Sequence, residues 1–130
     1  MATIPTKLKH GLKVGKDVLR DVVLREVTAG DIIDAQEESE KLVYAVENNK
    51  LVPTLVASPT LVGIHVLRRQ IVKIGDVDGP IELDLIKKLH PIDLNHLQQK
   101  AEELDGAAEG EAASQEVTQR GRHAGDGTGT

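Results

Sequence analysis

Apolar and polar residues alternate through the first part of the chain. In residues 7–14 (KLKHGLKV) the leucines and valine fall on one side of a strand and the lysines on the other. Residues 18–27 (VLRDVVLREV) are rich in β-branched side chains and follow the same period of two. Gly15-Lys16-Asp17 lies between the two segments, and Gly15 is free to adopt a positive φ. This pattern predicts a β-hairpin.

A helix-capping signal follows the hairpin. Thr28 can accept a hydrogen bond from a free amide, and Asp31, three residues later, can reach back and complement the helix dipole. Gly30 stands between these two residues. Apolar residues then recur at helical spacing, which predicts a first helix that ends at Asn48-Asn49. The residues of this stripe are Ile32, Ala35, Leu42, Val43 and Val46.

A second helix is predicted to begin at Ser58, with Pro59 at its first position, where the missing N–H costs nothing. Its apolar stripe continues to Gly75 and consists of Leu61, Ile64, Leu67, Ile71 and Ile74. Because the segment is rich in valine and isoleucine, a strand over residues 61–74 is an open alternative. Arg68-Arg69-Gln70 interrupts any alternation, which favours the helix.

Two further helices are expected, a short one with Leu83, Ile86 and Leu89, and a last one from Pro91 to Gly106. In residues 106–130, Val117 is the one aliphatic side chain larger than alanine, so this segment cannot offset its ordering entropy by burial. The expected fold is α+β: an N-terminal β-hairpin followed by three to four helices and a disordered C-terminal tail. The predicted domain covers residues 1–105, and the tail covers 106–130.

Composition excludes several classes of function. The 130 residues include no cysteine, phenylalanine or tryptophan, and Tyr44 is the one aromatic side chain of the Phe, Trp and Tyr class. Thiol chemistry and thiolate zinc sites are therefore excluded, as is stacking of nucleic-acid bases on aromatic platforms. A net charge of −5 argues against a general nucleic-acid binder. Since no run of about 18 apolar residues occurs, no membrane association and a cytoplasmic location are expected.

Charge is unevenly distributed along the chain. Residues 1–25 hold six basic and two acidic side chains, whereas residues 28–49 hold six acidic side chains and one lysine. Two interpretations are open: the segments form solvated faces that differ in sign, or they attract each other head to tail between copies of the chain.

No set of residues predicts an active site. His90, Asp93 and His96 are metal-ligating types, but His90 stands at a helix boundary and His96 at another angle of the helix. No catalytic residue, metal or cofactor is expected, and the chain is predicted to be an interaction protein rather than an enzyme.

Some apolar residues lie off the predicted helical stripes. Ile33 and Tyr44 fall away from the stripe of the first helix, and Val62 and Val66 from that of the second. A helix that is apolar on two sides lies either inside a core or against a partner. In so small a domain we favour a partner.

Two landmarks resemble a known family. Residues 8–34 read LKHGLKVGKDVLRDVVLREVTAGDIID, and residues 86–94 read IKKLHPIDL. Over residues 8 to about 104 the chain resembles the tail assembly chaperones of Mu-like phages in the order of hairpin, helix start and later short helix. The matching positions are Gly15, Leu24, Arg25, Glu26, Thr28, Gly30 and Asp31.

The resemblance implies a function in phage morphogenesis. Such chaperones bind the tape-measure protein and keep it soluble until the tail tube forms, and they often exist in two lengths through ribosomal frameshifting. They act in the host cytoplasm and are usually absent from the finished virion. The resemblance adds Arg25 to the candidate partner-binding residues, and we expect homo-oligomers. The alternative is a small structural or regulatory interaction protein of the phage.

Removal of residues 106–130 is expected to leave the melting temperature nearly unchanged, because this segment has little apolar surface to bury. Thermal denaturation followed by circular dichroism checks this. A large fall in melting temperature would show that the segment packs on the domain.

Overall fold

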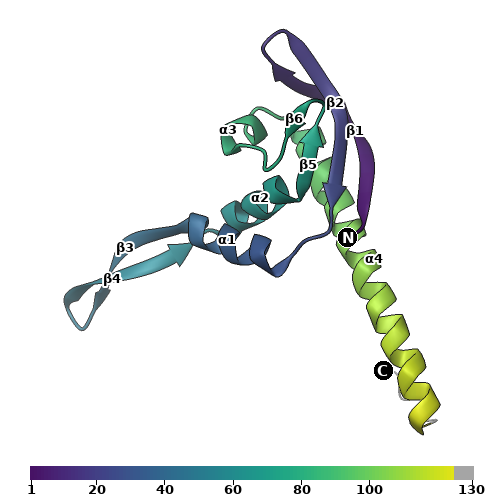
Figure 1. Cartoon of the computed structure of the whole chain (residues 1–130). Coiled ribbons are helices and arrows are strands. Elements are labelled where there is room, and N and C mark those ends of the chain that lie inside the picture. The colour runs from purple at the N-terminus through teal and green to yellow at the C-terminus, as the bar shows by residue number, and fades with distance from the viewer. Residues whose placement is uncertain (125–130) are drawn as a thin grey trace.

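The body of the protein is a four-stranded antiparallel sheet packed against helices (Figure 1). The computed structural model describes the backbone of residues 1–124 and the side chains of residues 1–107. The sheet has the order β1-β2-β5-β6, with β1 at Thr3–Val14, β2 at Asp17–Arg25, β5 at Ile71–Ile74 and β6 at Val77–Asp78. The predicted α+β class is confirmed.

The N-terminal hairpin forms as predicted and begins earlier, at Thr3. Gly15 has a φ of +62° in the turn, and Val14 pairs with Asp17 across it. The register shifts between Lys7 and Leu12, where β1 bulges. Gly11 lies in the bulge with a φ of +85°, and a Cβ there would come within 2.5 Å of Val18 Cγ1. Only glycine fits this position without a rearrangement.

Helix α1 (Ala29–Ser39) starts where the capping signal predicts. The amide of Asp31 donates to Thr28 Oγ1 at 3.2 Å, and the amide of Thr28 donates to Asp31 Oδ2 at 2.9 Å. The helix buries Asp31, Ala35 and Ser39, whereas Ile32 is 44% exposed. The predicted apolar stripe through Ile32 is therefore wrong, because the buried line of α1 begins at the capping carboxylate.

The continuation of this helix to Asn49 is also wrong. Residues after Ser39 form strand β3 (Glu40–Glu47), which pairs with β4 (Lys50–Ala57) in a separate two-stranded sheet. Leu42 and Val46 satisfy both a helical spacing of four and a strand period of two, so these positions cannot distinguish the two structures. The β3–β4 hairpin extends away from the body (Figure 1).

The segment 61–74 contains both of the structures considered for it. Helix α2 runs from Pro59 to Gln70 with Ser58 as its N-cap, and Ile71–Ile74 then form β5. Ile71 pairs with Leu24 of β2, so the chain joins the sheet at the residue that follows the helix. The predicted continuous helix to Ile74 is thus corrected to a helix followed by a strand.

The last two helices are α3 (Leu83–Ile86) and α4 (Pro91–Ala124). The expected end of α4 at Gly106 is wrong, since its backbone remains helical beyond that glycine. Its described contacts with the body nevertheless end near Asp105, and Gly106 and Ala107 are exposed. The division into a domain of residues 1–105 and a tail of 106–130 stays a prediction, and residues 125–130 lie outside the described part.

One core joins the sheet to α2, α3 and α4. It is entirely aliphatic, as the composition requires. Its members are Leu8, Leu12, Val22, Leu24, Leu67, Ile71, Ile74, Ile81, Ile86, Leu89, Leu97 and Ala101. Among the described residues, no helix is both long enough and apolar enough to cross a membrane.

A buried carboxylate attaches α4 to the bulge of β1. Asp93, in the first turn of α4, is fully buried and accepts hydrogen bonds from the amides of Lys9, His10 and Gly11 at 2.7, 3.0 and 3.1 Å. Burial alone would raise the pKa of Asp93, but the three amide donors lower it below its ordinary value. The carboxylate thus satisfies the amides that the bulge removes from the ladder.

Asp93→Asn is expected to reduce the free energy of unfolding at neutral pH by roughly 2–4 kcal/mol, because an amide group accepts fewer of these bonds and brings its own donors into the site. Since the folded-state pKa of Asp93 is depressed, its contribution is present above the unfolded pKa and is lost as pH falls through the folded pKa. The variant should therefore lose part of the acid dependence of stability. Urea denaturation between pH 7 and pH 2 checks this, with the exposed Asp34→Asn as control.

Candidate functional site

Among the described residues, seven of the thirteen exposed large hydrophobic side chains lie on the β3–β4 hairpin. Its strands are joined by Asn48-Asn49, which have φ angles of +50° and +61°. Two successive left-handed residues form the type I′ turn that suits the twist of a hairpin, and asparagine tolerates this conformation better than most residues. The Asn-Asn pair, flanked by β-branched alternating segments, is the signal from which the hairpin could have been predicted.

One face of this hairpin is apolar from Leu42 to the tip, and Glu40, paired with Ala57, lies at its base. Leu42 pairs with Leu55, Tyr44 with Pro53 and Val46 with Leu51, and directly paired residues share a face. The exposed fractions of Leu42, Tyr44, Val46, Leu51 and Leu55 are 58, 65, 74, 70 and 63%. We call these five residues and Pro53 the apolar face. The opposite face mixes Val43, Ala45, Val52 and Val56 with Lys41, Thr54, Glu47 and Lys50.

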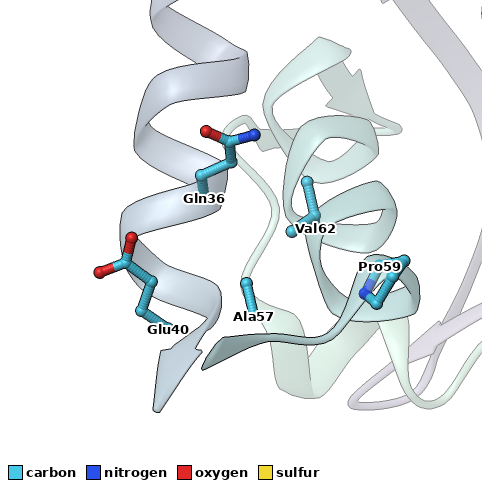
Figure 2. Close-up of a pocket in the computed structure, with 5 residues that line it drawn as sticks. All are labelled: Gln36, Glu40, Ala57, Pro59 and Val62. Atoms are coloured by element: carbon cyan, nitrogen blue, oxygen red, sulfur yellow. The ribbon is translucent and has the colours of Figure 1, made fainter. Parts of the chain in front are cut away.

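At the base of the hairpin, α1, α2 and the ends of β3 and β4 border an open hollow of about 400 Å³ (Figure 2). Its lining residues are Gln36, Glu40, Ala57, Pro59 and Val62. Both ends of the hairpin, Glu40 and Ala57, therefore contribute to it. The hollow thus lies at the junction of the hairpin and the body, and residues of both line it.

A charged cluster connects α1 to α2 below the hairpin. Glu38 lies 3.0 Å from His65 Nδ1 and 3.4 Å from Arg68 Nη2, and it also pairs with Arg69. Burial opposes the charge of Glu38, but Arg69, Arg68 and His65 together lower its pKa. Burial is also the main cause of the lowered pKa of His65, against the attraction of Glu38. These contacts join α1, which precedes β3, to α2, which follows β4.

Arg25, a candidate for partner binding, is engaged within the chain. Its guanidinium donates to Asp31 through two bonds of 2.7 and 2.8 Å and to the carbonyl of Glu26 at 2.9 Å. The hydrogen bond from Arg25 lowers the pKa of Asp31 most, and Thr28 adds to this effect against burial. The structure thus gives Arg25 and Asp31 a role in fixing α1. Gly30 has room for a Cβ, which would lie 3.7 Å from Thr28 Oγ1.

The remaining predicted partner-binding residues are dispersed. Ile33 is 57% exposed on α1, and Tyr44 lies on the apolar face instead of next to Ile33 on one helix. Val62 lines the hollow at the hairpin base, and Val66 lines another of about 350 Å³ between α2 and α4. The sequence pattern places Leu42 and Val46 on a core stripe and does not mark Leu51 or Leu55 as binding residues.

The side chains considered for metal binding have other contacts. Asp93 is occupied by backbone amides, His96 Nε2 lies 2.7 Å from Thr6 Oγ1, and His90 stacks on His10 with ring centroids 3.8 Å apart. Within the described residues, no group of three or more acidic or histidine side chains could hold a metal ion.

Comparison with known proteins identifies the family of this chain. The model of the family described as "Tail assembly protein gp41" matches residues 8–122. This chain belongs to that family. It is therefore a tail assembly protein of the Mu-like phage type, and the resemblance found in its sequence is confirmed.

Relatives in phage Mu and in a prophage support the assignment. The probable tail assembly protein gp41 of Escherichia phage Mu is 43% identical over 120 residues, which cover 89% of this chain and 78% of the relative. The Mu-like prophage FluMu protein gp41 of Haemophilus influenzae is 35% identical over 115 residues, 88% of this chain and 84% of the relative. No solved structure matches the chain.

A longer relative shares the same region. The probable tail assembly protein FS-gp41 of Escherichia phage Mu is 45% identical over 105 residues, 78% of this chain. Those residues make up 54% of FS-gp41, so this chain spans about half the length of that relative.

The double variant Leu42→Thr/Leu55→Thr is expected to leave the fold intact, because both side chains are exposed on a hairpin outside the core. Each change should alter the free energy of unfolding of the body by less than ~0.5 kcal/mol, and threonine retains strand propensity. Urea denaturation checks this. A loss of several kcal/mol would show that the apolar face supports the body.

Proposed function

We propose that this tail assembly protein is a chaperone whose apolar face binds the tape-measure protein and keeps it soluble before the tail tube forms. The observation that carries the proposal is the projecting hairpin with its exposed leucine, tyrosine and valine side chains. Contiguous exposed apolar surface of this kind is typical of interaction sites.

The form of the hairpin suits a helical client. A long helical protein awaiting assembly presents apolar stripes along its helices, and a flat apolar sheet face can cover such a stripe without a preformed pocket. The six side chains of the apolar face include no charged group, so covering them buries no unpaired charge. The proposed role requires no catalysis and no cofactor.

The proposal also includes where the chain acts and the existence of a longer product. The chain acts in the host cytoplasm and leaves before the virion is complete. A longer product of frameshifting would carry this domain together with a second one, and the length of FS-gp41 beyond the aligned part supports such an arrangement.

Co-expression with the tape-measure protein of the same phage tests the proposal. The native chain is expected to raise the soluble fraction of the tape-measure protein severalfold and to co-purify with it. Leu42→Thr/Leu55→Thr should remove both effects. The matched control is Val18→Thr/Val72→Thr, which changes two exposed valines on β2 and β5 of the body and should behave like the native chain.

Two results would overturn the proposal. One is a tape-measure protein that stays insoluble with the native chain present. The other is stoichiometric recovery of this chain from purified mature tails, which would assign it a structural role.

A further inference from the structure

The β3–β4 hairpin has two strand edges, and neither is paired within the described residues. The two-residue turn closes on Glu47 and Lys50, so this pair exchanges both of its backbone hydrogen bonds, and every second pair along the hairpin does the same. The intervening residues direct their N–H and C=O groups outward. On β3 these are Leu42, Tyr44 and Val46, and on β4 they are Leu51, Pro53 and Leu55.

The two edges differ in their ability to accept another strand. Pro53 lies at an outward-facing position of β4 and has no N–H, so the edge of β4 is interrupted at its middle. Directly opposite, Tyr44 retains its donor, as do Leu42 and Val46 on the same edge. Edge proline is a known protection against strand addition, and here it protects only one of the two edges.

We propose that the open edge of β3 pairs antiparallel with β3 of a second copy of this chain, about a two-fold axis at Tyr44. In this register Leu42 faces Val46 of the second copy, and Lys41 faces Glu47 of the second copy, which gives an ion pair on each side of the axis. A register centred on Val43 would place Lys41 opposite Ala45 and Glu40 opposite Val46, with no charge compensation. Charge complementarity therefore selects the axis at Tyr44.

The pairing produces a closed dimer with a larger apolar surface. Directly opposite residues share a face, so the apolar faces of the two hairpins join in one four-stranded sheet in the order β4-β3-β3-β4. Its outer edges are the two β4 strands, each interrupted by Pro53, so strand addition ends at two copies. The dimer forms from this chain alone and does not depend on the proposed binding of a tape-measure protein.

Disulfide cross-linking tests the register. The native chain has no cysteine, so single substitutions create a single thiol. Tyr44→Cys places the two thiols opposite each other at the axis, at a Cα separation of about 5.5 Å, which a disulfide can bridge. In Val46→Cys the thiols lie about 13 Å apart along the strands, although Val46 is as exposed as Tyr44. Mild oxidation of the full chain should cross-link Tyr44→Cys at least about tenfold faster than Val46→Cys.

A pair of proline variants tests the edge. Leu42→Pro and Leu55→Pro are directly opposite, and each removes one outward N–H and one leucine of the apolar face. Leu42→Pro should raise the dimer dissociation constant about tenfold or more, since one interchain donor is lost from each copy. Leu55→Pro should leave it within about twofold of the native value, because its N–H faces the β4 edge. Sedimentation equilibrium measures both, and circular dichroism confirms that the body remains folded.

Three outcomes would overturn the inference. A native chain that is monomeric throughout the micromolar range excludes the dimer. Equal cross-linking of the two cysteine variants excludes the register. Equal weakening by the two proline variants would show that copies associate through the apolar face and not through the edge of β3.

Discussion

The hydrogen bonds from the β1 bulge to the buried carboxylate of Asp93 are the interaction on which the body depends. The bulge removes several amides from the strand ladder, and the first turn of α4 supplies the acceptor that they need. This fixes α4 across the hairpin, and the aliphatic side chains of β2, β5 and α2 pack into the space so defined. The domain thus completes its core without any contribution from the apolar face of β3 and β4.

The core contains no residue of the β3–β4 hairpin, so the hairpin is free of a structural role in the body. A two-stranded hairpin with no covering layer is marginally stable in water, and its strand edges invite association. The hairpin follows α1 and precedes α2, and Glu38 joins these two helices through ion pairs, which fixes the base of the hairpin. Within the described residues its apolar side chains are exposed. The described structure thus separates a packed body from a hairpin with exposed apolar side chains.

Ion pairs within the molecule change the interpretation of the uneven charge along the chain. The basic first segment and the acidic second one indicated either solvated faces or attraction between copies. The structure pairs Arg25 with Asp31 between these segments and pairs Glu38 with two arginines of α2. Part of the acidic charge of residues 28–49 is thus paired with arginines of the same molecule. These ion pairs help to fix α1, which composition alone does not show.

Local chemistry in the chain is enough to predict the first hairpin around Gly15, the helix start at Thr28 and Asp31, and the helix start at Ser58-Pro59. The order of these elements also identifies the family. Only the tertiary structure shows that residues 71–74 form a strand, because β5 pairs with β2, which is distant in the sequence. For residues 40–57 the apolar spacing is ambiguous, and the Asn48-Asn49 turn is the local signal that favours a hairpin. Leu42 and Val46 fit both periods, and what makes them strand is pairing with β4 across a two-residue turn. Helix α2 ends before Ile71 because residues 71–74 pair with β2 as a strand of the sheet. The exposure of the apolar face follows from the same cause, since a periodic pattern shows which residues share a side but not whether the fold covers it.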